Sequence, residues 1–182
     1  MRRSEAHEYR QACNAQAVVC ADGAQLILAT GITASPADAP GFAGTILAME
    51  TTVGLPRVVP ADTGFASGPA LAELQQRGIE PLVAIGRTQP HRPYDFRPPP
   101  KPKAARRITE SWRIAMKAKL ETDDAKTLCK KRKQTVEPVF GIIKSALGFL
   151  RFRLRGLQNV ATEWTLIALA YNCRRITRLQ AA

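Results

Sequence analysis

The chain has 182 residues, with 27 lysines and arginines against 15 aspartates and glutamates, and a formal net charge of +12. Its length allows one domain with a hydrophobic core, with or without a helical appendage. The four cysteines are far apart and form no CxxC pair, no signal peptide precedes them, and no apolar run could span a bilayer, so zinc-finger, disulfide-framework and transmembrane classes are excluded.

The positive charge lies in the second part of the chain. Residues 1–100 carry 8 basic and 9 acidic side chains, whereas residues 101–182 carry 19 basic and 6 acidic ones. A field of this kind favours a polyanion, and nucleic acid is the expected partner. A basic tail that is ribosome-associated or only increases solubility is the alternative.

The first half alternates strand and helix patterns. Residues 17–33 (AVVCADGAQLILATGIT) predict two strands around an Asp22-Gly23 turn. After a loop at 35–41, the pattern predicts a helix over 42–54, a strand over 56–61, a helix over 69–78 and a strand over 79–86. Such alternation predicts an α/β sheet with parallel pairing.

The second half reads as helical after a proline-rich, basic loop or linker at residues 86–107. We expect helices over Thr109–Lys119, Asp123–Lys131, about Val136–Leu147 and about Val160–Leu179. FLRFRLRG (149–156) alternates apolar and basic residues, which suggests an extended segment with one basic face.

One acid stands apart in the basic half. Glu137 follows four consecutive cations in KKRKQTVEPVFGIIK (130–144), where a strip that only binds phosphate would exclude carboxylates. It could be a metal ligand, with Lys144 two helical turns further on the same face touching phosphate. Alternatively, it is a first-turn acid stabilised by the helix dipole, with Pro138 at an early helical position.

Asp62 is the corresponding candidate in the first half. It follows an apolar strand, and α/β folds build their sites at the carboxyl ends of strands. On this stretch alone the simpler interpretation, a turn cap with Gly64 allowing the bend, is favoured.

These stretches together resemble the DDE transposases of bacterial insertion sequences. The resemblance rests on NAQAVV (14–19), PADTGFAS (60–67), KKRKQTVEPVFGIIK, FRLRGLQNVATEW (152–164) and ALAYNCRRI (168–176), and it covers about Glu8 to Leu179. It implies a single catalytic domain over 1–182 with an RNase H-like mixed sheet flanked by helices and a basic helical C-terminal part. It also implies three carboxylates that hold two Mg²⁺ or Mn²⁺ ions for strand cleavage and transfer.

The resemblance carries individual roles onto this chain. Asp62 matches the second acid, in a block that usually has tyrosine where this chain has Phe65, and Glu137 matches the third acid. Arg132 and Lys144 match basic positions expected to contact DNA phosphate, and Cys129 stands where the family usually has tyrosine. The further cations expected on DNA are Lys133, Arg151, Arg153, Arg155, Arg174, Arg175 and Arg178.

The first acid departs from the family pattern. The family reads roughly YNAQAVVD, and this chain reads CNAQAVVC (13–20), so that Cys13 replaces the tyrosine and Cys20 the expected aspartate. A thiol is a poor Mg²⁺ ligand. Asp22 would share the strand face if the strand continued, which makes it a weak substitute, and Asp38 is a remote one.

The expected function is DNA transposition by a catalytically impaired DDE transposase; the alternative is a non-catalytic, basic DNA-binding remnant. The helical region that usually recognises terminal repeats is not seen ahead of residue 8, so we expect a C-terminal fragment. The expected partners are insertion-sequence ends and target DNA, with a possible homo-oligomer and no membrane. The expected location is the bacterial cytoplasm, with the nucleoid.

Overall fold

The two faces of the NAQAVV strand contact different parts of the protein. A computed structural model describes residues 2–3, 9–10, 12–86 and 109–181. In it, Ala15, Ala17 and Val19 pack against the core beneath the last helix, whereas Val18 packs against a second core. Side chains alternate across a strand, so this sheet separates the two cores.

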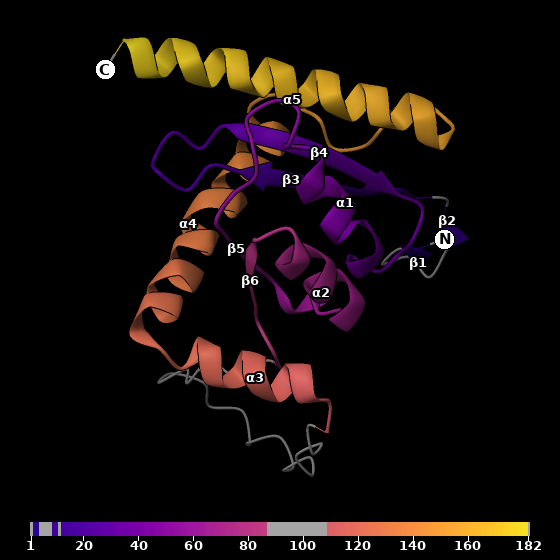
Figure 1. Ribbon diagram of the computed structural model, residues 1–182. Helices are drawn as coiled ribbons and strands as arrows, with labels where there is room; N and C mark the ends of the chain where they lie inside the picture. Colours follow the sequence, from indigo (N-terminus) through magenta and orange to yellow (C-terminus); the bar gives the residue numbers. More distant parts are fainter. Residues whose placement is uncertain (1, 4–8, 11, 87–108, 182) are drawn as a thin grey trace, which may run out of the picture.

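Helices and strands alternate as the sequence predicts, which confirms the mixed α/β class (Figure 1). The elements are β1 (Arg2–Arg3), β2 (Tyr9–Arg10), β3 (Asn14–Val19), β4 (Ile27–Thr33), α1 (Phe42–Leu47), β5 (Val58–Ala61), α2 (Gly68–Gln76), β6 (Glu80–Val83), α3 (Ser111–Leu120), α4 (Asp123–Ser145) and α5 (Leu157–Gln180), with 3-10 turns at Ala39–Gly41 and Thr63–Phe65.

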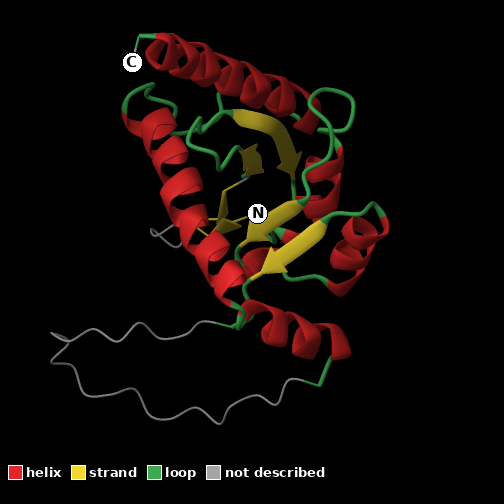
Figure 2. Cartoon of the chain, turned by 60° about the vertical axis from the view of Figure 1, so that its left-hand side comes forward, coloured by secondary structure: helices red, strands yellow, loops and turns green. Residues whose placement is uncertain are grey.

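The described strands form three separate two-stranded sheets, β1-β2, β3-β4 and β5-β6 (Figure 2). The β3-β4 pair is the expected hairpin, antiparallel with Asn14 opposite Thr33, and β5 pairs with β6 in parallel, with Val58 opposite Glu80. The parallel pairing expected from the alternation of strands and helices is found in β5-β6.

Two apolar cores lie on either side of the β3-β4 hairpin. One lies beneath α5 and includes Ile27 from β4, Val139 and Ile143 from α4, and Trp164 and Tyr171 from α5. The other joins α1, β5, α2 and β6 around Ile46, Leu74 and Val83, with Met116 of α3 at its border. Because β3 contributes to both, the hairpin fixes the positions of α4 and α5 relative to β5.

Helix α4 is longer than expected. The two helices predicted over 123–131 and 136–147 are one continuous helix, which runs through Pro138. Proline has no N–H to donate to the carbonyl four residues earlier, here that of Gln134. Gln25 supplies the missing donor, because its Nε2 lies 3.0 Å from the Gln134 carbonyl oxygen.

Two other boundaries differ from the prediction. The helix expected over 42–54 ends at Leu47; the chain then turns, and the Met49 carbonyl accepts from the amides of Thr52, Val53 and Gly54. FLRFRLRG forms no strand and has no single basic face, because Phe152 packs into the core while Leu150 and Leu154 are exposed.

The predicted proline-rich loop lies outside the described residues from position 87 onward. Within the described ranges, no helix is both long enough and apolar enough to cross a membrane.

The hairpin turn should be a stability determinant. Substituting Gln25→Ala removes the donor to Gln134, and we expect the free energy of unfolding to fall by about 1 kcal/mol. Chemical denaturation followed by circular dichroism measures the change. Gln76→Ala, an exposed glutamine at the end of α2, is the matched control and should cost nothing; equal effects would contradict the role given to Gln25.

Candidate active site

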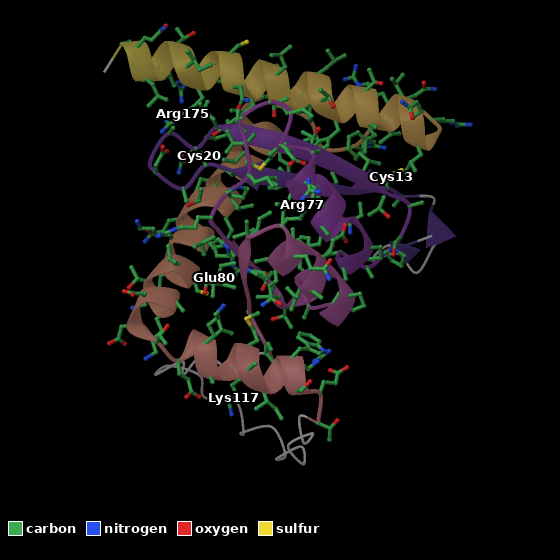
Figure 3. All side chains as sticks on the ribbon, viewed as in Figure 1. Cys13, Cys20, Arg77, Glu80, Lys117 and Arg175 are labelled. Atoms are coloured by element: carbon green, nitrogen blue, oxygen red, sulfur yellow. The ribbon has the colours of Figure 1, made fainter. Side chains whose placement is uncertain are left out.

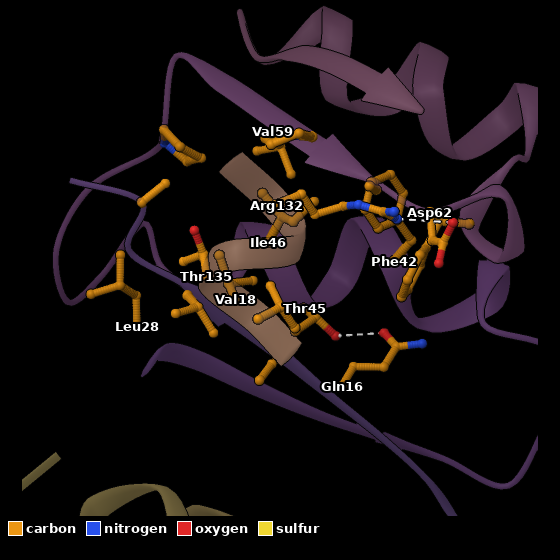
Figure 4. A pocket seen from close by; sticks show the side chains of 18 of the residues that line it. Gln16, Val18, Leu28, Phe42, Thr45, Ile46, Val59, Asp62, Arg132 and Thr135 are labelled. Carbon is orange, nitrogen blue, oxygen red and sulfur yellow. Dashed lines mark hydrogen bonds and ion pairs between the residues drawn. The ribbon is translucent and has the colours of Figure 1, made fainter. Parts of the chain in front are cut away.

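A cavity of about 430 Å³ brings together the acids that the sequence singles out. It lies between the edges of β3 and β5 and is bordered by α1 and α4 (Figure 4). Asp62, Glu137, Asp38 and Cys20 all contribute to its lining, although they come from four different segments. The remaining lining is largely apolar and includes Val18, Leu28, Phe42, Ile46 and Val59.

Asp62 directly follows β5, and the carboxyl end of this strand borders the cavity. It also makes the contact of a turn cap, since its Oδ1 accepts from the Thr63 amide at 2.9 Å. The same oxygen lies 2.9 Å from a guanidinium nitrogen of Arg132. The Asp62 side chain is 65 % exposed, whereas that of Arg132 is 18 % exposed, so the cation is held inside the protein against the acid.

Arg132 is a residue for which the sequence predicts a contact with DNA phosphate. In the structure its guanidinium forms an ion pair with Asp62. In Figure 4 the Arg132 side chain extends toward the Asp62 carboxylate.

Glu137 lies in the middle of α4 and not in its first turn. The helix begins at Asp123, fourteen residues earlier, so the interpretation of Glu137 as a dipole-stabilised N-terminal acid is wrong. Glu137 lines the cavity, while Lys144, two turns further along, is exposed and outside the cavity lining.

Cys20 follows the last residue of β3 and borders the cavity (Figure 3). Its Sγ donates a hydrogen bond to Asp22 Oδ1 at 2.9 Å. Burial raises the pKa of the Cys20 thiol, and the hydrogen bond to Asp22 acts in the same direction. The thiol is therefore protonated at neutral pH, and the protonated form is not a metal ligand.

Asp22 lies in the turn and is not among the residues that line the cavity. The strand has already ended at Val19; the Asp22 carboxylate accepts from the Ala24 amide at 3.1 Å as well as from Cys20. The hydrogen bond from Cys20 is the main cause that lowers the pKa of Asp22.

Sequence reasoning missed the polar contacts that hold Asp38 at the cavity. Asn14 Nδ2 donates to Asp38 Oδ1 at 2.6 Å, and Gln16 Nε2 donates to the Asp38 carbonyl at 2.7 Å. Thr45 Oγ1 lies 3.2 Å from Gln16 Oε1. The period-2 placement of Asn14 and Gln16 on one strand face was the available signal.

The donor groups do not fit a two-metal centre. Within residues 12–86 and 109–181, no group of three or more His, Cys, Asp or Glu side chains could hold a metal ion. A guanidinium lies on Asp62, and a protonated thiol stands at the first acid position.

The cations predicted to contact DNA fall into different environments. Lys144, Arg151, Arg153, Arg155, Arg174 and Arg178 are exposed. Arg175 instead donates to the carbonyls of Gly23 and Ala24, at 3.0 and 2.8 Å, and so ties α5 to the hairpin turn (Figure 3). The side chain of Lys133 lies outside the described part of the chain.

These features define a class of protein: a basic α/β protein with two acids from distant segments in one cavity, next to a cation-rich helix. Comparison with known families then makes the assignment specific. The family model described as "Transposase DDE domain" matches residues 2–173, and the chain therefore belongs to the DDE transposase domain family. Neither the curated proteins nor the solved structures gave a match.

The loop that carries Asp62 is packed tightly against Asp38. A Cβ atom added to Gly64 would lie 2.2 Å from Asp38 Oδ2, whereas one added to Gly44 would meet nothing within 4 Å. Gly64→Ala must displace the Asp38 carboxylate from Asn14, and we expect the free energy of unfolding to fall by roughly 1–3 kcal/mol.

Gly44→Ala is the matched control, because it lies within α1 and should be neutral or stabilising by up to about 1 kcal/mol. Thermal unfolding of the two variants measures the difference. If Gly64→Ala is as stable as Gly44→Ala, the close approach of the two loops is not a constraint.

Proposed function

We propose that this chain is a DNA-binding transposase domain whose strand-cleaving chemistry is impaired. Family membership points to DNA transposition as the process. The observation that supports impairment is the composition of the cavity, where Asp62 and Glu137 lie together but the third position holds the Cys20 thiol.

An RNase H-like arrangement is the fold we assign to this domain. An antiparallel hairpin precedes the parallel β5-β6 pair, one acid follows β5, and another acid comes from a long helix beside them. This order supports the assignment; the described strands pair two by two.

The residues in the cavity act on one another rather than on a reacting group. In active members of the family, divalent ions supply the activation of a water or a 3′-hydroxyl. Here Arg132 balances the charge of Asp62. Next to the cavity, the Asp22 carboxylate accepts a hydrogen bond from the Cys20 thiol. Glu137 lines the cavity from α4, and we assign it to the third acid position.

DNA binding rests on the exposed cations of the second half of the chain. Arg151, Arg153 and Arg155 lie together on the segment between α4 and α5, and Lys144 lies in the last turn of α4. The Glu163 carboxylate accepts from the backbone amides of Arg153 and Leu154 at 3.0–3.1 Å, which orders this segment. Such cations contact phosphate without reading sequence.

The identity of residue 20 should control metal affinity. We expect the native chain to cleave no DNA strand with Mg²⁺ or Mn²⁺, and Cys20→Asp to raise Mn²⁺ affinity by roughly tenfold or more, because a carboxylate replaces a thiol in a hard-ion site. Electron paramagnetic resonance of free Mn²⁺ measures binding without any need for activity. Cys20→Ser is the control and should give no gain.

Two results would separate the proposal from its alternative. If Cys20→Asp binds Mn²⁺ no better than Cys20→Ser, the surrounding geometry is lost too, and the chain is a non-catalytic DNA-binding remnant. Cleavage by the native chain that disappears in Glu137→Gln would refute the proposed impairment.

DNA affinity should depend strongly on salt. We expect the logarithm of the binding constant to fall linearly with the logarithm of salt concentration. Replacing Arg151, Arg153 and Arg155 by glutamine should reduce the slope by roughly two to three, because each phosphate that a cation neutralises accounts for about 0.9 of it. Fluorescence anisotropy with a labelled duplex measures the slope.

The matched control replaces three cations that lie outside this segment, Arg57, Arg77 and Lys117, all of them exposed. It should leave the slope nearly unchanged. An affinity that does not vary between low and moderate salt would rule out phosphate binding as the basis of the interaction.

A further inference from the structure

Exposed leucines and arginines are interleaved on the segment between α4 and α5. We define the connecting segment as residues 148–157 (GFLRFRLRGL). Its Leu150 is 75 % exposed, the highest value among the large apolar side chains in the described part of the chain, and Leu154 is 51 % exposed. Single exposed leucines are ordinary on a protein surface. Two of them among three exposed arginines form a mixed apolar and basic surface, which is typical of a binding site.

The two leucines take no part in the core of the protein. Phe149 and Phe152 pack against the core beneath α5, and the Phe152 ring meets the Trp164 ring edge-on, with 6.3 Å between their centroids. The phenylalanines therefore anchor the connecting segment, while Leu150 and Leu154 remain on the outside, available to a partner.

The backbone of the connecting segment is held in place from α5. The Glu163 carboxylate accepts from the amides of Arg153 and Leu154 at 3.0–3.1 Å. Asn159 Nδ2 donates to the Arg155 carbonyl at 2.9 Å. Because this backbone is already ordered, a partner that binds the segment does not have to order it, and less conformational entropy is lost on binding.

Charge and apolar surface together indicate the kind of partner. The connecting segment carries three arginines and no acid, and Lys144 is exposed in the last turn of the preceding helix. These cations favour a polyanion, and the leucines favour one that also offers apolar surface. Duplex DNA does so between its stacked bases, and proteins that kink DNA insert leucine there and place arginine in the minor groove. Membership of the DDE transposase domain family favours DNA over other polyanions.

We propose that the connecting segment is a wedge that unstacks DNA. Leu150 and Leu154 insert between base pairs from the minor groove, while Arg151, Arg153 and Arg155 contact the phosphates on either side. This inference rests on the proposed function, because it requires that these arginines bind DNA. It adds that binding distorts the duplex, so that affinity depends on how easily a base step is unstacked.

A duplex that contains an unpaired site tests the wedge. Unstacking costs less free energy at a mismatch than at a paired step. At one salt concentration, we expect the native chain to bind a duplex with a central two-base mismatch about tenfold more tightly than a fully paired duplex of the same length. Fluorescence anisotropy measures both affinities. A 2-aminopurine base beside the mismatch should brighten on binding, because it loses its stacking neighbour.

Removing both leucines should remove the preference. The double variant Leu150→Ala, Leu154→Ala should bind the two duplexes within about twofold of each other and give no 2-aminopurine signal, with an unchanged salt slope because the arginines remain. The matched control is Leu166→Ala, Leu169→Ala, which removes two leucines of α5 that are 60 % and 57 % exposed. It should keep the preference. Circular dichroism checks that both variants are folded.

The outcomes separate the wedge from DNA binding itself. Equal binding of the two duplexes by the native chain overturns the wedge, as does a preference that the double variant at Leu150 and Leu154 retains. In both cases salt-sensitive DNA binding would persist, and the proposed function would stand. A chain that binds neither duplex overturns the proposed DNA binding and the wedge together.

An anionic membrane is the other surface that mixed apolar and basic residues suit. Sedimentation with vesicles of phosphatidylserine and phosphatidylcholine tests it, and we expect the native chain and the double leucine variant to sediment to the same extent. Vesicle binding that requires Leu150 and Leu154, in a chain that shows no preference for the mismatched duplex, would assign the connecting segment to lipid and overturn the wedge.

Discussion

The fold depends on the β3-β4 turn, because this turn is hydrogen-bonded to both α4 and α5. Gln25 has a positive φ of 55°, and this conformation presents its side chain to α4 and its carbonyl to α5. The side chain donates to the Gln134 carbonyl that Pro138 leaves without a partner in the helix, and the Gln25 carbonyl accepts from the Tyr171 hydroxyl at 3.1 Å. Without a continuous α4, Glu137 would have no fixed position relative to Asp62. Asn172 strengthens the attachment of α5 to the hairpin, because its side chain accepts from the Ile27 amide and donates to the Ile27 carbonyl.

The cavity collects acids from distant segments, but its donor groups do not suit a metal centre. Strand β5 and helix α4 bring Asp62 and Glu137 to one place, which requires the fold to be largely intact. At position 20, however, burial raises the pKa of the Cys20 thiol, and the Arg132 guanidinium lies against Asp62. A neutral thiol and a nearby guanidinium both leave the cavity with less uncompensated negative charge than three carboxylates would.

Local signals in the sequence were enough for some elements and not for others. The Asp22-Gly23 turn, the β5-α2-β6 unit and the last helix follow from turn chemistry and hydrophobic period, and the structure has them near the predicted bounds. The break expected between residues 131 and 136 was wrong. The helix is continuous through Pro138, and the compensating donor, Gln25, is more than one hundred residues away in sequence. The Arg132–Asp62 ion pair was missed for the same reason, since it joins two segments whose approach only the fold determines. FLRFRLRG was misread because the packing of Phe152 and the amide contacts to Glu163 override its alternation.

The β3-β4 hairpin stands between α5 and the cavity, because one of its faces packs beneath α5 and the other contributes to the second core. A ligand bound along the outside of α5 would therefore be separated from Asp62 and Glu137 by a layer of sheet. It could influence the cavity only by moving the hairpin.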